Sequence, residues 1–258
     1  MDRRRFLRSL TATAAGAAIW PLASSAAFAI GPRSLLEIGM LRYDGNFDPR
    51  PTGVRRMLQE VEKRTSIAVE TKPPGIDPAD REHLFTTPML FWAGDRAFSP
   101  LSVAARDNLA TWLGAGGMIV VDSAEGQVDA PFITSVRREL AAIAPGKGLI
   151  DIPRSHVVYK SFYLIPDPVG RVSIARTMQG VFGPDRAMVL LSQNDLLGAW
   201  ARDNLGNFEY DVFPGGDRQR EMAYRLGVNL VMYALCLNYK EDQVHVPFIL
   251  KRRKWKVD

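Results

Sequence analysis

Carboxylate and amide side chains gather in four short segments of the chain, each directly after a run of apolar residues. Carboxylates that lie close together repel one another, which raises their pKa values or requires a cation, and paired carboxylates can serve as general acid and base. A fold that joined the four segments would therefore create a ligand-binding or hydrolytic edge. Its candidate residues are Tyr43, Asp44, Asn46, Trp92, Asp95, Asp122, Ser123, Gln193, Asn194 and Asp195.

The four aspartates also have a purely structural interpretation. Asp and Asn often follow strands because their side chains form turns and cap the next helix. A working site predicts that at least two of the carboxylates face one concave pocket. Capping predicts that they point apart, each toward its own helix. The four are Asp44, Asp95, Asp122 and Asp195.

A fifth segment, residues 200–211, mixes aromatic, amide and charged side chains, among them Trp200 and Arg202. Rings that stack on a sugar and polar groups that bond its hydroxyls would suit a glycan. The alternative is a loop that packs its rings on the core and pairs its charges locally. Both residues are therefore added to the candidate ligand-binding edge.

Familiar catalytic and cofactor signatures are missing from the sequence. It has no glycine-rich phosphate loop, no G-x-S-x-G turn and no paired histidines at zinc-ligand spacing. Ser123 follows an apolar strand, where a nucleophile could stand, but no histidine is adjacent to it in the sequence. The single cysteine, Cys236, lies in an apolar helical run and cannot form an intrachain disulfide. We expect no metal and no cofactor.

The elements that would position these residues are clearest between residues 86 and 143. An apolar strand at 89–93 precedes a helical stripe at 105–113, and a glycine cluster at 114–117 ends that helix. A second apolar strand at 118–121 precedes a second stripe at 132–143. Strands that alternate with helices are typical of a parallel sheet. The carboxyl ends of parallel strands share one edge, so the polar segments should meet there.

The remaining pattern extends this α/β arrangement to one domain over residues 30–258. Further strands are expected at 35–41, 66–70, 156–165 and 187–191. Helices are expected at 54–61 and from 214 to 237, with a short helix or turn at 77–82. Residues 145–186 are otherwise irregular, and 200–213 form a long polar loop.

The first 29 residues have the pattern of an export signal. Arg3, Arg4 and Arg5 precede Phe6-Leu7, a weakly apolar stretch follows, and Ala27-Phe28-Ala29 resembles a cleavage site. The arginine pair indicates the twin-arginine route. We therefore expect a bacterial protein exported to the periplasm or cell envelope, with membrane contact only if the signal stays uncleaved.

The net charge of +5 gives little support to nucleic-acid binding. Residues 1–29 contribute +3, which leaves +2 for residues 30–258. A nucleic-acid binder would concentrate basic residues on one face. The basic cluster of residues 251–256 at the C-terminus is expected to be a solvated tail, and attachment to a nucleic acid or an anionic lipid is its alternative role.

Four segments together resemble an uncharacterised bacterial family, domain of unknown function 4159, whose members are often exported. They are Phe91–Asp95, Gly116–Ser123, Ser192–Ala201 and Arg225–Tyr233, and the resemblance extends from about Leu35 to Arg253. It implies a three-layer flavodoxin-like sandwich with a mainly parallel sheet, of the class I glutamine amidotransferase-like type. Active amidotransferases of that type use a Cys after a strand, with a downstream His and Glu. Here Ser123 stands at that place, so the resemblance implies the fold without the activity.

Two functional hypotheses follow from these observations. The first is a non-catalytic binding or assembly domain of the cell envelope, with a degenerate amidotransferase-like site and an envelope protein or glycan as partner. The second is a hydrolase or carbohydrate-active enzyme that uses the carboxylates at the sheet edge.

Overall fold

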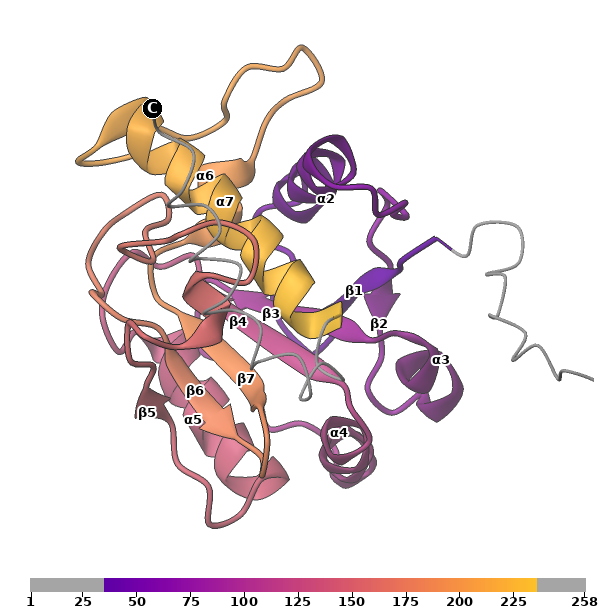
Figure 1. Ribbon diagram of the computed structural model, residues 1–258. Coiled ribbons are helices and arrows are strands. Elements are labelled where there is room, and N and C mark those ends of the chain that lie inside the picture. Colours follow the sequence, from indigo (N-terminus) through magenta and orange to yellow (C-terminus); the bar gives the residue numbers. More distant parts are fainter. Residues whose placement is uncertain (1–34, 236–258) are drawn as a thin grey trace, which may run out of the picture. The chain divides into compact units, whose positions relative to one another are not determined.

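The computed structural model describes residues 35–235, which belong to one compact α/β unit (Figure 1). The expected signal at 1–29, the thiol of Cys236, His245 and the basic cluster at 251–256 lie outside the described residues. Within residues 35–235, no helix combines the length and the apolar character needed to cross a membrane.

A seven-stranded sheet forms the middle layer, in the order β2-β1-β3-β4-β7-β6-β5. The first five strands in that order are parallel, whereas β6 and β5 run antiparallel to β7 and β6 respectively. The strands are β1 (Ile38–Leu41), β2 (Gly75–Ile76), β3 (Met89–Gly94), β4 (Met118–Ser123), β5 (Ile150–Asp151), β6 (Gln179–Phe182) and β7 (Ala187–Ser192).

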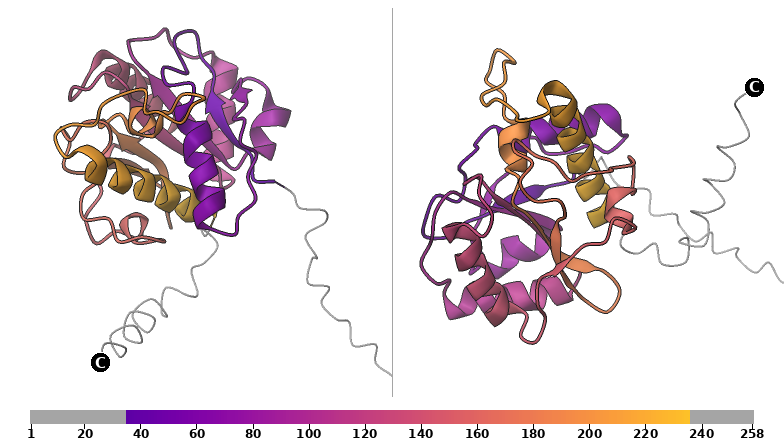
Figure 2. Two further views of the ribbon diagram at one scale, coloured as in Figure 1. Left: turned by 90° about the horizontal axis from the view of Figure 1, so that it is seen from above. Right: turned by 90° about the vertical axis from the view of Figure 1, so that its left-hand side faces the viewer.

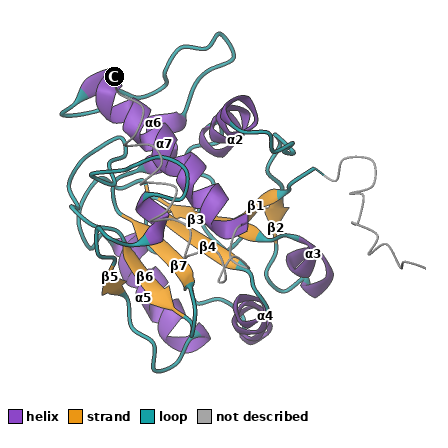
Figure 3. Cartoon of the chain, viewed as in Figure 1, coloured by secondary structure: helices purple, strands orange, loops and turns teal. Residues whose placement is uncertain are grey.

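Helices cover both faces of this sheet, which gives the expected three layers (Figures 1 and 3). One face carries α3 (Arg81–Thr86), α4 (Val103–Gly114) and α5 (Pro131–Ile143). The other carries α2 (Gly53–Arg64), α6 (Leu196–Trp200) and α7 (Gly216–Leu235). The two further views in Figure 2 show the same separation. The α/β sandwich with a mainly parallel sheet is thus confirmed.

The central strands are apolar throughout because both of their faces are covered. In β3, Met89 and Phe91 point into the core beneath α2, α6 and α7, whereas Leu90 and Trp92 point into the core beneath α3, α4 and α5. All six residues of β3 are buried, and the same holds for β4. Two hydrophobic cores, one on each face, therefore fix the sheet.

Local signals explain the helix that joins these two strands. Ser102 caps α4, since its hydroxyl accepts a hydrogen bond from the Ala105 amide at 3.1 Å. Gly116 follows the helix with a φ of 122°, a conformation that suits glycine. The expected strand–helix–glycine–strand unit is therefore present.

The order of the strands locates the place where this fold could hold a ligand. The chain passes from β1 outward to β2 and then returns to β3 on the other side of β1. Such a reversal opens a crevice between the carboxyl ends of the two flanking strands, here β1 and β3. The carboxyl ends of β1, β3, β4 and β7 share that edge, as expected.

Two of the expected strands are absent, and three observed strands were not expected. Residues 156–165, expected as a strand, form a 3₁₀ turn at Val157–Tyr159 followed by bends, because their groups bond to α7 instead of a neighbouring strand. Residues 66–70 make only an isolated bridge between Val69 and Leu36. The strand beside β1 at the edge of the sheet is instead β2, inside a Pro- and Gly-rich stretch, and β5 and β6 were not expected either.

Candidate functional site

Two of the four predicted carboxylates meet where α6 begins. Asp122, at the end of β4, accepts hydrogen bonds from the amides of Leu196 and Leu197, each at 2.9 Å. Asp195 precedes α6 and accepts from the Gly198 amide at 2.9 Å. Both carboxylates therefore cap the same helix, α6, rather than a helix each.

Two arginines compensate the charge of the fully buried Asp195. Arg50 contacts both of its carboxylate oxygens, at 2.8 and 3.3 Å, and the Arg171 Nε also bonds it. Asp122 has no such cation among the described residues. Burial, together with the charge of Asp195, raises the pKa of Asp122 to about 8. The pair is thus an internal charge cluster rather than an exposed acid and base.

Tyr43 closes the crevice between β1 and β3. Its hydroxyl donates to the Ala93 carbonyl oxygen of β3 at 2.9 Å, and its ring packs at a tilt of 43° against Phe98, with ring centres 4.4 Å apart. Burial, reinforced by the charge of Asp95, raises the pKa of Tyr43. A Cβ atom added to Gly94 would lie 2.5 Å from the Tyr43 hydroxyl oxygen. The crevice is therefore filled by the protein itself.

The third predicted carboxylate, Asp95, is partly exposed beside Tyr43. Asp95 accepts a hydrogen bond from Asn46 at 2.7 Å and pairs with Arg96 at 2.8 Å. The Arg96 guanidinium chiefly accounts for a lowered pKa of Asp95. Asp44, the fourth, is exposed. These two do not join the Asp122–Asp195 pair.

Ser123 stands at the end of β4 but is fully buried. Its hydroxyl accepts a hydrogen bond from the Glu125 amide at 3.3 Å. Glu125 in turn accepts from the Phe132 amide at 3.0 Å and so caps the start of α5. The serine thus belongs to the turn that leads into that helix.

The described histidines lie at the opposite edge of the sheet from Ser123. His83 contacts Glu37, just before β1, with the Nε2 and Oε1 atoms 3.3 Å apart. His156 packs edge-on against Tyr233, whose hydroxyl accepts from the first amide of β7. Among residues 35–235, therefore, no histidine is placed to activate the serine.

The amides after β7 organise loops rather than face solvent. The Asn194 side chain donates to the carbonyls of Pro168 and Ala175 and accepts from the amides of Ile174 and Ala175. Gln193 accepts from the Asp129 amide at 2.6 Å. Asn194 thus holds residues 168–175 against the sheet edge, and Gln193 holds Asp129 there.

The two tryptophans among the candidates lie in the cores. Trp92 and Trp200 are both fully buried, and Trp200 meets Phe91 edge-to-face with ring centres 5.9 Å apart. Neither presents its ring to a ligand at the sheet edge. Arg202 is different, because it lines a hollow between α2 and α7.

Sequence reasoning missed Arg50 and Arg171, which hold Asp195. Arg50 lies in a turn-rich loop and Arg171 in the irregular region 145–186, and neither has a spacing that marks it. The one signal that could have pointed to these arginines is the acidic edge itself, because carboxylates that become buried together require cations nearby.

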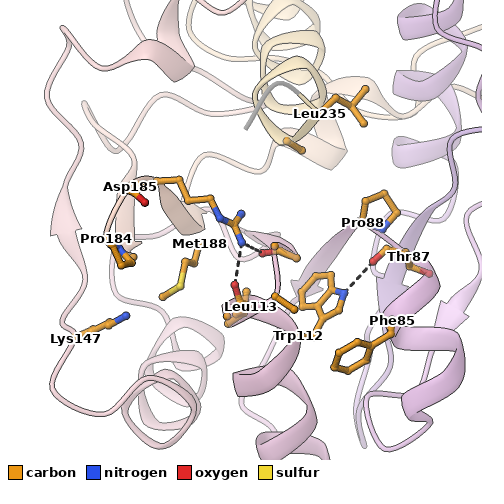
Figure 4. Close-up of a pocket in the computed structure, with 17 residues that line it drawn as sticks. Phe85, Thr87, Pro88, Trp112, Leu113, Lys147, Pro184, Asp185, Met188 and Leu235 are labelled. Carbon is orange, nitrogen blue, oxygen red and sulfur yellow. Dashed lines mark hydrogen bonds between the residues drawn. The ribbon is translucent and has the colours of Figure 1, made fainter. Parts of the chain in front are cut away.

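Two hollows of the described residues are lined by none of the four edge carboxylates. The larger, about 1040 Å³, is at the amino ends of the strands, between Pro88, Gly117, Arg186 and the end of α7 at Leu235. Figure 4 shows the Trp112 indole in its wall, donating to the Thr87 carbonyl at 3.0 Å. The smaller hollow, about 290 Å³, is the one that Arg202 lines.

Potential metal ligands are also scattered. Within the part of the chain that the structure describes, no three His, Cys, Asp or Glu side chains are grouped so that they could hold a metal ion.

A comparison with protein families matches residues 37–235 to a family model described as a domain of unknown function (DUF4159). The match begins one residue before β1 and ends with α7, so it covers the whole sheet and both helix layers. No curated protein matches the chain.

Proposed function

Since the chain belongs to the DUF4159 family, whose description assigns no activity, we propose a function from its own geometry: a non-catalytic binding or assembly domain of the bacterial cell envelope. Its carboxyl edge would then be a degenerate amidotransferase-like site. An envelope protein or glycan would be its partner.

One observation carries this proposal: most polar side chains of the carboxyl edge already bond backbone groups or arginines of the protein itself. Tyr43 fills the crevice between β1 and β3, and Asp122 and Asp195 are taken up by backbone amides and by arginines. An active site needs an exposed reacting group with room for substrate beside it. The buried Ser123 and the filled crevice offer neither.

Export is the second part of the proposal, and it rests on the sequence of residues 1–29. Their arginine pair, weakly apolar stretch and Ala27-Phe28-Ala29 pattern support the twin-arginine route. Residues 30–258 would then form a single exported domain.

The experiment is an activity and binding assay with the purified protein. The protein is incubated with peptidoglycan fragments, polysaccharides and ester substrates, and products are followed by mass spectrometry. Binding to isolated cell-wall sacculi is measured in parallel by co-sedimentation. We expect saturable binding without product. Turnover that disappears in Asp122→Ala would overturn the proposal.

The same assay decides the alternative, a hydrolase that works through the carboxylates. One observation favours it: Asp122 has a raised pKa beside a second carboxylate, a pattern seen in general acids. Against it, both Asp122 oxygens already accept backbone hydrogen bonds. Turnover by the wild-type protein together with loss in Asp122→Ala is the outcome that this alternative requires.

A further inference from the structure

The smaller hollow lies between α2, α7 and the loop that follows α6. Its volume is about 290 Å³, which suits one small chemical group rather than a polymer chain. It is lined by Glu60, Lys63, Arg64, Arg202, Phe208, Asp217, Arg220, Glu221 and Tyr224. Four of these side chains are cations and three are acids.

The acids of α2 and α7 are largely occupied. Arg64 bonds Glu60 at 2.7 Å and bonds both oxygens of Glu221 at 2.9 Å. Arg225 bonds Glu221 as well, at 2.8 Å. Asp217 is exposed in the first turn of α7. Of the three carboxylates that line the hollow, it is therefore the one that forms no ion pair with a described residue.

Two other arginines are held against one aromatic ring. The guanidinium carbons of Arg220 and Arg202 lie 3.6 and 4.3 Å from the centre of the Phe208 ring. Neither arginine forms an ion pair with a described residue. Two positive charges held on the same ring repel each other, and an anion bound in the hollow that both residues line would relieve that repulsion.

Arg220 is the fixed member of this pair. It is only 6% exposed, and its two terminal nitrogens donate to the carbonyls of Ala199 at 2.8 Å and Tyr210 at 2.7 Å. Its Nε is buried without a partner. Carbonyl groups orient the guanidinium but carry no negative charge. The charges of Asp217 and Asp211 act on it without forming an ion pair, and Arg220 lines the hollow as a cation.

Arg202 is the accessible member. It is half-buried, and its guanidinium lies 4.3 Å from the Phe208 ring and 5.5 Å from the Tyr224 ring. Burial raises the pKa of the Tyr224 hydroxyl, and the nearby Arg202 charge opposes that rise. A planar guanidinium held by rings presents a fork that matches a carboxylate or phosphate with two parallel hydrogen bonds.

We propose that this hollow binds an oxyanion group, a carboxylate or a phosphate, with Arg202 as the direct contact and Arg220 as the fixed charge behind it. The inference deepens the proposed binding function, on which it rests, by naming the chemistry of the ligand. Acidic sugars and phosphate-bearing envelope components both carry such a group.

The test titrates the purified full-length protein with sodium glucuronate and with sodium phosphate at constant ionic strength, followed by calorimetry. Sodium chloride is the control titration. We expect saturable binding of at least one of the two oxyanions. Arg202→Gln should weaken it at least tenfold, whereas Asp217→Asn, which removes the unpaired acid, should strengthen it. Arg154→Gln, at an exposed arginine paired with Asp167, is the matched control and should change nothing.

The two probes separate the sources of the ligand. Glucuronate binding alone identifies a carboxylate ligand, and phosphate binding alone identifies a phosphate ligand. The proposal is overturned if neither probe saturates, or if Arg202→Gln, folded by circular dichroism, binds as the wild type does. Should Arg202→Gln not fold, an unchanged affinity in Asp217→Asn overturns it. Substrate turnover in the activity assay described above would overturn the proposed non-catalytic function, but it would not change the result of this titration, so the two failures can be told apart.

Discussion

Asp195 is the residue on which most of the polar edge depends. It has a left-handed backbone with φ of 53°, caps α6 and bonds both Arg50 and Arg171. Loss of its side chain would leave two partly buried cations without their carboxylate partner and one helix amide unsatisfied. Removing one member of a buried ion pair is costly for this reason.

Asp195→Ala is therefore expected to lower the free energy of unfolding by about 3–5 kcal/mol. The measurement is urea denaturation followed by circular dichroism. Asp95→Ala removes a largely exposed ion pair and is the control, with an expected loss below about 1 kcal/mol. Equal losses in the two variants would contradict the interpretation of Asp195.

Asp122 makes stability depend on pH in a specific direction. Its folded-state pKa lies above the unfolded value, so the folded protein binds more protons between about pH 4 and about pH 8. The contribution of Asp122 to stability therefore falls as pH rises through that window, by at most about 1.4 kcal/mol per pH unit. Asp122→Asn lacks this titration, so its unfolding free energy should fall less steeply over the same range. Parallel curves for the two proteins would show that Asp122 ionises normally.

At the scale of elements, the close approach of α2 and α6 positions the charge cluster. Gly53 begins α2 directly against the α6 backbone, and a Cβ added to it would lie 2.5 Å from the Leu197 carbonyl oxygen. Arg50, three residues earlier, reaches Asp195 because the helix starts there. The small residue thus permits both the packing and the ion pair.

Gly53→Ala is expected to destabilise the protein by about 1–3 kcal/mol, since a backbone atom must move to admit the methyl group. Gly114→Ala, at the end of α4 with no atom within 4 Å of the added Cβ, is the matched control. It should be neutral or stabilise by up to about 1 kcal/mol. Thermal unfolding of both variants checks this difference, and a loss of the same size at both positions would contradict the steric argument.

At the scale of the whole molecule, the prediction concerns the cell compartment in which the protein is found. Replacing both Arg4 and Arg5 with lysine removes at least one arginine of the twin-arginine pair, whether that pair is Arg3-Arg4 or Arg4-Arg5. We expect the protein to be retained in the cytoplasm, as measured by immunoblots of fractionated cells. Arg8→Lys keeps the pair and should be exported normally. Export of the double variant at the wild-type level would contradict the assignment of the signal.

Much of the fold could be predicted from the sequence because its signals are local. Apolar runs as long as one strand, helical stripes and a glycine stop define the unit from β3 to α5. Alternation of strands and helices then required a parallel sheet, which placed the polar segments at one edge. The short antiparallel β6 was not predictable, because its pairing with β7 depends on a distant segment.

The site could be predicted only as a set of segments. Which carboxylates meet depends on tertiary contacts: Asp122 reaches the amides of a helix 74 and 75 positions away in the sequence, and Asn46 reaches Asp95. Sequence spacing does not indicate that Trp92 and Trp200 are core residues or that Tyr43 fills the crevice. The sequence by itself determined the parallel strands β1, β3, β4 and β7 and their polar edge, because these signals depend on neighbouring residues. Only the tertiary structure decided that the edge is internally bonded and that Arg202 and Arg220 share a ring, because burial and charge pairing arise between segments far apart in the chain.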